Sequence, residues 1–445
     1  MEKTRCITSP RTASSPLILC MPHCDVLGHA GRTLRLATGL RSALPDYRIE
    51  FAGSGLCAPI IERAGFRVHP VVEFLQQDWK QVEDAARTHR AMVRSAGQVR
   101  RFVEEELDLF ETLRPSVVIG DHRYTLFTST QVARVPFVSI TNAFYTRYSS
   151  LRVGAPKALF PVYHHHPALA LFHPLVATLV GPLVPHFIRY LGRLHCTPYD
   201  VVRREYGLEP HRDLFDFYSG DHVILPDWPE ICPTRSLPAS YHYVGMFGWT
   251  PPPELPPQID AAGEMIYVTL GSTGRPEEFA KLLSGLGSFR DRQVVVTTGP
   301  CFGRDALGAL PANVAVHRFL PGNEVLERAV LAVHHGGMGI LGQCLTAGVP
   351  MVCIPGNVEQ EVMARQFVHR HGLGVVVERY RLTPRKVEKA VRTVLEDPRY
   401  ARNVRAFARR LRPLDPLGTA VEKVRELATD RAFTEAVRRG AWRRV

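Results

Sequence analysis

Short apolar runs alternate with stretches of helical periodicity along most of the chain. LILCM (17–21) is the first such run, and a helix-period stretch from about residue 32 to 43 follows it. Further predicted strands cover residues 48–53, 68–72, 116–120, 137–141, 265–272, 293–299, 314–320, 331–337, 350–356 and 374–378. Strands that alternate with helices are typical of the α/β class with parallel sheets, which is the fold class that we predict.

A proline-rich stretch divides the pattern into two halves. Residues 225–258 include LPDWPEICPTRSLP and TPPPELPPQ, a composition typical of a stiff, extended linker. The predicted organisation is a disordered tail (1–15), a first α/β domain (16–224), the linker (225–262), a second α/β domain (263–425) and a basic C-terminal helix or tail (426–445). Two such halves imply a cleft, with ligands at the carboxyl ends of the strands.

The most apolar run lies between residues 167 and 191. Four prolines and two histidines interrupt it, so no continuous apolar span of about 20 residues remains for a membrane helix. The pattern favours a pair of short, buried helices broken by proline, with a pocket function. Peripheral contact with a membrane is the alternative.

Composition narrows the class of protein. Of 445 residues, 45% are hydrophobic and 22% are charged, which excludes a disordered or collagen-like chain. The net charge of +12 suits anionic partners, but no nucleic-acid-binding signature accompanies it, so we predict no nucleic-acid binding. Nine scattered cysteines without a C-x-x-C pair are typical of a reduced, cytoplasmic protein, and we see no signal sequence for secretion.

One continuous stretch carries the strongest chemical signal. It reads HHGGMGILGQ (334–343), AGVP (347–350) and IPGNVEQ (354–360). A strand that ends at His335 turns through glycines into a helix, whose free N–H groups can bind an anion beside the histidine ring. A tight turn that needs glycine only for packing is the structural alternative.

This stretch resembles the donor-binding signature of the GT-B glycosyltransferases of the UDP-glycosyltransferase family, especially bacterial members that act on natural products. VTLGS (268–272), FLPGNEVL (319–326) and Gly28-His29 extend the resemblance over nearly the whole chain. It implies two Rossmann-like domains that face each other across a cleft, with the acceptor bound in the first and the nucleotide sugar in the second.

The resemblance also implies roles for individual residues. His335 and the glycine turn would contact the donor diphosphate, Ser272 and Thr273 the β-phosphate, Phe319 and Leu320 the base, and Glu359 and Gln360 the sugar hydroxyls. The donor-binding residues expected on these grounds are Ser272, Thr273, Phe319, Leu320, His335, Gly336, Gly337, Met338, Gly339, Gln343, Glu359 and Gln360.

Three positions depart from the family's pattern. Arg32 replaces a proline, Ile340 replaces a threonine or serine near the phosphate, and Gln343 replaces the glutamate that binds the ribose hydroxyls. The last two leave room for a dTDP-sugar as well as a UDP-sugar.

The expected catalytic residues are His29 and Asp121. In the family, the matching histidine removes the acceptor hydroxyl proton, and an imidazole suits this step near neutral pH. The matching aspartate orients the ring and stabilises its charged form. His23, Asp25 and His122 are nearby competitors for these roles.

The resulting hypothesis is an inverting, metal-independent glycosyltransferase. It moves a sugar from a UDP- or dTDP-sugar to a small, apolar natural-product-like acceptor, and it is a monomer or homodimer. We expect no metal at His164-His165-His166, because three consecutive residues converge poorly on one ion. Alternatives are transfer to a lipid-linked acceptor at a membrane face, epimerisation, or a non-catalytic sugar-nucleotide-binding partner of another enzyme.

Overall fold

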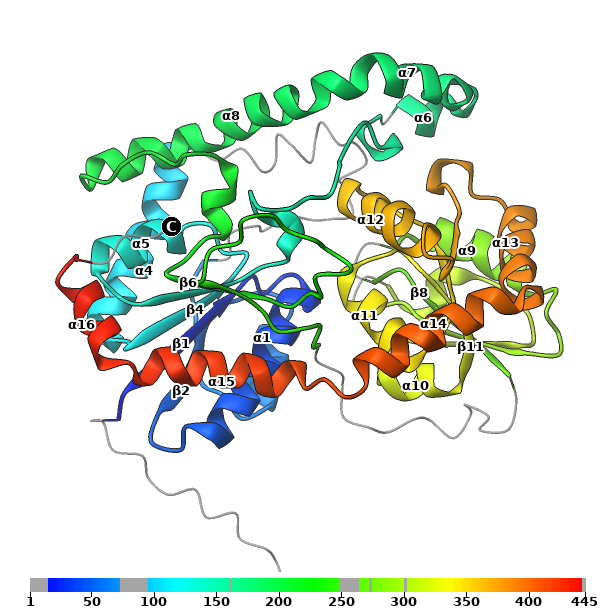
Figure 1. The fold of residues 1–445 in the computed structure, drawn as a ribbon. Coiled ribbons are helices and arrows are strands. Elements are labelled where there is room, and N and C mark those ends of the chain that lie inside the picture. Colours follow the sequence, from blue (N-terminus) through cyan, green and yellow to red (C-terminus); the bar gives the residue numbers. More distant parts are fainter. Residues whose placement is uncertain are drawn as a thin grey trace, which may run out of the picture.

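The computed structural model describes residues 15–72, 95–160, 162–248, 264–271, 274–299 and 302–441, and shows two parallel α/β domains (Figure 1). The first sheet has the order β3-β2-β1-β4-β5-β6-β7 and the second the order β10-β9-β8-β11-β12-β13, with every pairing parallel. The predicted GT-B fold class of two Rossmann-like domains is confirmed.

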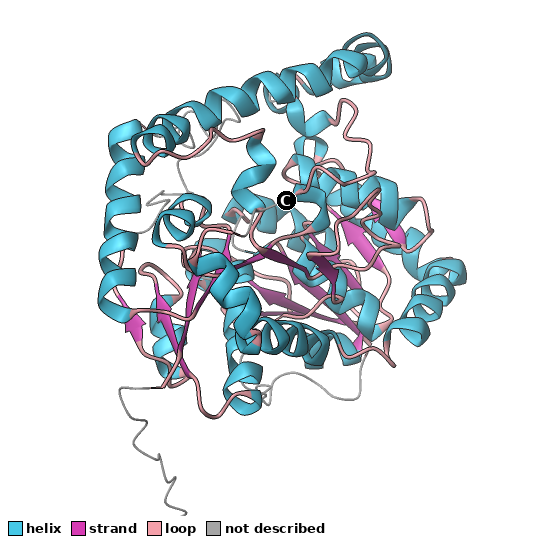
Figure 2. Ribbon diagram, turned by 60° about the vertical axis from the view of Figure 1, so that its left-hand side comes forward, coloured by secondary structure: helices cyan, strands magenta, loops and turns pink. Residues whose placement is uncertain are grey.

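Figure 2 shows helices packed around both sheets. The strands are β1 (Leu17–Pro22), β2 (Arg48–Ala52), β3 (Val68–His69), β4 (Val117–Asp121), β5 (Phe137–Ile140), β6 (His222–Leu225), β7 (Tyr241–Tyr243), β8 (Met265–Thr269), β9 (Gln293–Thr297), β10 (Val314–His317), β11 (Ala329–His334), β12 (Met351–Cys353) and β13 (Gly374–Val376). The longer helices are α1 (Leu27–Ala43), α4 (Ala96–Leu113), α5 (Leu126–Ala133), α7 (His173–Val180), α8 (Val184–Glu205), α9 (Pro276–Leu286), α11 (Met338–Ala347), α13 (Pro384–Glu396), α14 (Pro398–Leu411), α15 (Pro416–Thr429) and α16 (Arg431–Arg438). The shorter helices are α2 (Ala58–Arg63), α6 (Val162–His165), α10 (Gly322–Arg328) and α12 (Val358–Met363).

Each sheet reverses its strand order at one point. In the first sheet the reversal lies between β1 and β4, and in the second between β8 and β11. Loops that leave neighbouring strands in opposite directions open a crevice there, where ligands of open α/β sheets bind. Asp121 is the last residue of β4, and His29 lies in helix α1, which follows β1. His335 directly follows β11.

The C-terminal helices return to the first domain. Figure 1 shows α15 and α16, coloured orange-red to red, running beside that domain, and α15 packs against α1. Within the stretch expected as a linker, β7 pairs with β6 and therefore belongs to the first sheet. The domain boundaries themselves stay predictions.

The burial predicted for the apolar run is wrong. Residues Ala168–Glu205 form one helical stretch, long and apolar enough to cross a membrane by length and composition, yet only 11% of its apolar window is buried. Pro174 and Pro185 lie in the first turns of α7 and α8, where a helix needs no N–H from proline, so they do not break the stretch.

Candidate active site

The first half of the site is a histidine–aspartate pair at the first reversal point. β1 and β4 pair in register with Pro22 opposite Asp121, so the loop after β1 and helix α1 pass over the end of β4. His29, in the first turn of α1, lies with Nδ1 2.8 Å from Oδ1 of the buried Asp121. The two residues that the sequence predicts to be the base and its orienting carboxylate are therefore in hydrogen-bond contact in the structure.

Arg32 lies one turn after His29 and binds the same carboxylate. Its Nη2 donates to Asp121 Oδ1 at 2.7 Å and its Nε to Oδ2 at 2.5 Å, while Nη1 donates to Asn142 Oδ1 at 2.9 Å. In the sequence, Arg32 stands out only as a departure from the family's pattern. The available signal was its i, i+3 spacing from His29, which places both side chains on one face of α1.

The charges of this cluster set its protonation states. Burial alone would raise the pKa of Asp121, but Arg32 and His29 hold it well below its usual value. Burial lowers the pKa of His29, the Arg32 cation lowers it further, and Asp121 opposes both effects. The carboxylate is therefore ionised at neutral pH, and the His29 ring is neutral and able to accept a proton.

Aromatic rings surround the His29 imidazole. His122, with a left-handed backbone (φ 56°), stacks on His29 at a centroid distance of 4.1 Å and contacts the rings of Tyr145 and Tyr218. The His23 ring also stacks with the His29 ring, at a centroid distance of 6.2 Å. The base candidate thus lies among flat, largely apolar surfaces, and burial keeps the pKa of His122 well below its ordinary value.

Two further hydrogen bonds extend this cluster, and one of them reaches the second domain. Asn142, which accepts from Arg32, donates to Asp227 Oδ1 at 2.9 Å, and burial raises the pKa of Asp227 to about 6. Three residues after Asn142, the Tyr145 hydroxyl donates to Glu359 Oε2 at 2.5 Å. Glu359, expected to bind the sugar, therefore lies close to the His29 cluster, and the two halves of the candidate site meet there.

The second half of the site lies at the other reversal point. His335 follows β11, and Gly336, with φ 85°, turns the chain toward α11, whose first residues are Met338 and Gly339. The His335 ring packs so closely against its neighbours that a Cβ at Gly337 would lie 2.3 Å from its Nε2, and one at Gly271 would lie 2.7 Å from its Cε1. Burial lowers the pKa of His335 to about 4, so the ring is neutral at pH 7.

Other expected donor residues have structural contacts of their own. Gln360 Oε1 accepts from the Gly356 N–H at 2.8 Å, and Asn357 caps α12 through the Gln360 N–H. Leu320 and Ile340 are buried in the core of the second domain, which explains why an apolar side chain is accommodated at position 340. Gln343 lies against Gly322 at the start of α10.

Phe319 is partly exposed and lines a hollow between the domains. This hollow has a volume of about 290 Å³, and its lining residues are Asp25, Leu27, Leu56, Cys57, Ile60, Arg63, Arg318 and Phe319. An exposed ring at the rim of an interdomain hollow is accessible to a flat ligand. Ser272 and Thr273, also expected to bind the donor, lie outside the described residues.

Within the described part of the chain, one group of side chains has metal-binding geometry. Ligand atoms of His29, Asp121 and His122 lie within 4.8 Å of one another. Both oxygens of Asp121 already accept hydrogen bonds from the Arg32 guanidinium, and that cation opposes a second positive charge beside it.

Known proteins resemble this chain in sequence and in fold. A family described as "Erythromycin biosynthesis protein CIII-like, C-terminal domain" matches residues 280–423. A "PGL/p-HBAD biosynthesis rhamnosyltransferase" of Mycobacterium bovis (strain BCG / Pasteur 1173P2) is 30% identical over 320 residues, which cover 70% of this chain and 68% of the relative. A "PGL/p-HBAD biosynthesis glycosyltransferase" of Mycobacterium tuberculosis (strain ATCC 25177 / H37Ra) is 26% identical over 91% of this chain and 92% of its own length.

Solved structures agree on the architecture. The glycosyltransferase of kitacinnamycin superposes with a TM-score of 0.65 at 21% identity, covering 92% of this chain and 99% of that one. "Spinosyn Rhamnosyltransferase SpnG complexed with thymidine diphosphate" gives 0.63 at 17% identity, with coverage of 92% and 99%. The family expected from the sequence is confirmed: the chain belongs to the GT-B glycosyltransferases of the UDP-glycosyltransferase family and is a glycosyltransferase that uses a sugar donor.

Proposed function

We propose that the protein transfers a sugar, with inversion and without a metal, from a UDP- or dTDP-sugar to a hydroxyl of an apolar acceptor. The observation that carries this proposal is the His29–Asp121 hydrogen bond of 2.8 Å. With Nδ1–H directed at the carboxylate, Nε2 holds the lone pair that removes the acceptor proton. The acceptor oxygen then attacks the anomeric carbon from the face opposite the nucleotide.

The second domain supplies groups for the departing diphosphate. The His335 ring, held between Gly271 and Gly337, lies beside the N-terminus of α11, whose free N–H groups favour negative charge. Stabilising the charge that develops on the leaving group lowers the barrier to bond breaking. The SpnG complex with thymidine diphosphate supports a nucleoside diphosphate as the ligand here.

Arg32 supports a mechanism without a metal at the base. Its guanidinium already pairs with the Asp121 carboxylate, which a metal ion at this place would need as a ligand. The aromatic surfaces of His122, Tyr145 and Tyr218 support an apolar or aromatic acceptor beside His29.

The test compares His29→Ala with His23→Ala. We expect His29→Ala to lose transfer by about a hundredfold to ten-thousandfold, while its affinity for a nucleoside diphosphate stays within a few-fold. His23→Ala serves as the matched control, since His23 is the competing imidazole nearby and should retain most activity. Transfer is followed as nucleoside diphosphate release that depends on an acceptor. Full activity in His29→Ala together with loss in His23→Ala would reverse the assignment.

A second candidate is transfer to a lipid-linked acceptor at a membrane face. The exposed apolar helices of the first domain favour it over a freely diffusing acceptor. Comparing a soluble acceptor with the same acceptor group on a lipid in vesicles separates the two candidates, because only a membrane enzyme gains rate from the vesicle.

A further inference from the structure

The helical stretch Ala168–Glu205, called the arm below, lies across the top of the molecule (Figure 1). Its C-terminal part packs on α4 through Cys196, Tyr199 and Val202. Just before the arm begins, α6 contacts the segment Arg379–Arg381 of the second domain. The arm is therefore anchored to the body near both ends, while its middle carries apolar side chains on the outside.

Those exposed side chains form one stripe. They recur every three or four residues and so share one face of the helix. The stripe consists of Phe172, Leu175, Leu179, Leu183, Phe187, Tyr190 and Leu194, each between 43% and 65% exposed. Isolated exposed apolar residues are ordinary, but a contiguous stripe of this kind marks a surface that another apolar phase covers.

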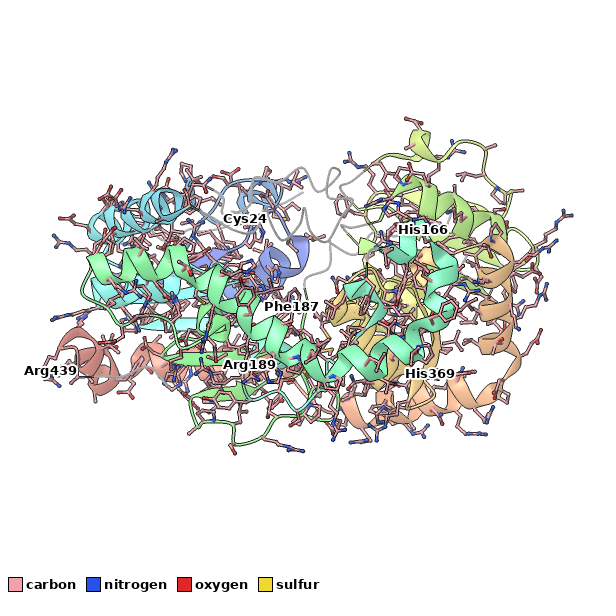
Figure 3. The ribbon with its side chains drawn as sticks, turned by 90° about the horizontal axis from the view of Figure 1, so that it is seen from above. Cys24, His166, Phe187, Arg189, His369 and Arg439 are labelled. Atoms are coloured by element: carbon pink, nitrogen blue, oxygen red, sulfur yellow. The ribbon has the colours of Figure 1, made fainter. Side chains whose placement is uncertain are left out.

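The charged side chains of the arm segment that carries the stripe have a single sign. From His122 to Tyr199 the sequence contains neither aspartate nor glutamate. His186, Arg189 and Arg193 are exposed along the arm beside the stripe, and Figure 3 shows Phe187 and Arg189 on the arm as seen from above. An apolar face flanked by arginines fits an interface of acyl chains and anionic headgroups, where arginine keeps its charged end in the polar layer.

The anchoring of the arm favours binding along a bilayer over crossing it. A spanning helix needs about 20 apolar residues surrounded by lipid. Here the arm lies across the top of both domains, and Arg189 and Arg193 interrupt its second half. A helix that lies in the interface buries only one face, which is what the stripe offers.

We propose that the arm docks the protein on the surface of a bilayer that contains anionic lipid. The stripe enters the headgroup–acyl boundary, and Arg189 and Arg193 contact the lipid phosphates. This inference goes beyond the proposed function and does not depend on His29 being the base.

The test is sedimentation of the purified full chain with vesicles, either of phosphatidylcholine alone or of an equimolar mixture with phosphatidylglycerol. We expect strong binding to the mixture and weaker binding to phosphatidylcholine. Leu179→Glu should weaken binding to the mixture by about tenfold or more, whereas Leu414→Glu, which adds the same charge at another exposed leucine, should leave it unchanged.

A second pair of variants isolates the charge. Arg189→Gln with Arg193→Gln should lower binding to the anionic mixture toward the level seen with phosphatidylcholine, and Arg402→Gln with Arg409→Gln on α14 is the matched control. Acceptor-independent hydrolysis of the donor should stay unchanged in all four proteins, which separates failed docking from failed chemistry.

Two results would overturn the proposal. One is equal sedimentation of the unmodified protein and Leu179→Glu with the mixed vesicles. The other is an absence of vesicle binding together with a dimer in light scattering that Leu179→Glu converts to a monomer, because the stripe would then be covered by a second copy of the chain.

Discussion

At the scale of single residues, the main feature of this site is the Arg32 cation, which lies beside His29, the proposed base. Two of the partners of Asp121 compete for its charge: the Arg32 guanidinium donates to both carboxylate oxygens, and His29 shares one of them. A carboxylate held in this way still fixes the orientation of the imidazole. It gives less support to a positive charge on the ring, because the nearby guanidinium opposes that charge.

Arg32→Gln should therefore move the pH profile. Arg32 lowers the pKa of His29 in addition to the effect of burial, so removing its charge raises that pKa. Because the base must be neutral, the acid limb of kcat/KM should shift to higher pH. The measurement is kcat/KM against pH for the unmodified enzyme, Arg32→Gln and Arg32→Lys.

Arg32→Lys keeps the charge without the fork, so its acid limb should stay near that of the unmodified enzyme even where its rate falls. An acid limb in Arg32→Gln that coincides with the unmodified one would show that another group controls the profile. Thermal unfolding of each variant shows whether the fold stays stable when the buried Asp121 carboxylate loses its guanidinium partner.

Which site residues could be read from the sequence depends on how local their signals are. His29 and His335 follow strands within a few residues, so strand and loop patterns locate them. The roles of Asn142, Tyr145 and Asp227 rest on contacts between segments far apart in the chain, such as Tyr145 with Glu359. Neither periodicity nor residue spacing predicts a contact between segments so far apart in the sequence.

At the scale of elements, strands were more predictable than the exposure of helices. All eleven predicted runs correspond to strands of the two sheets. The short strands β6 and β7 were not predicted, and β7 lies within the proline-rich stretch. The arm was predicted to be broken and buried. Pro174, Pro182 and Pro185 lie in first turns, where they are compatible with a helix, and α8 continues through Pro198. Apolar composition alone does not show whether a protein core or another phase covers a helix.

Gln343 in helix α11 leads to a prediction about which nucleotide the protein prefers. A glutamate is only an acceptor and suits two neighbouring ribose hydroxyls, whereas the Gln343 amide offers one carbonyl and one NH₂ and forms weaker, uncharged hydrogen bonds. The absence of a 2′-hydroxyl should therefore matter less. We expect UDP and dTDP to bind within about tenfold of each other, and Gln343→Glu to shift the preference toward UDP.

Calorimetry with both nucleotides measures this preference directly. Thr346→Glu, which adds the same charge at an exposed position one turn further along α11, should leave the ratio unchanged. A preference for UDP of about a hundredfold in the unmodified protein would contradict the argument.

At the scale of the whole molecule, the two domains are joined by more than a linker. Lys157 pairs with Glu378, the Ala158 N–H donates to Glu361 Oε2 at 2.8 Å, and Tyr145 reaches Glu359. On the opposite side, α15 and α16 extend from the second domain and pack on the first. These connections hold the two halves of the candidate site in contact, as the proposed transfer between two bound substrates requires.

The packing of α15 on α1 should couple the C-terminal segment to the active site. Val424 is fully buried in the core cluster of the first domain, and Gly39 of α1 lies so close to α15 that a Cβ there would be 2.6 Å from Val421. Helix α1 also carries His29 and Arg32. Val424→Ala leaves a small cavity at this contact and should lower the free energy of unfolding by about 1–3 kcal/mol. Glu422→Ala, on the exposed face of the same helix, should change it by about 0.5 kcal/mol or less. Denaturant unfolding followed by tryptophan fluorescence compares the two variants, and equal midpoints would show that α15 contributes no stability to the domain that holds the base.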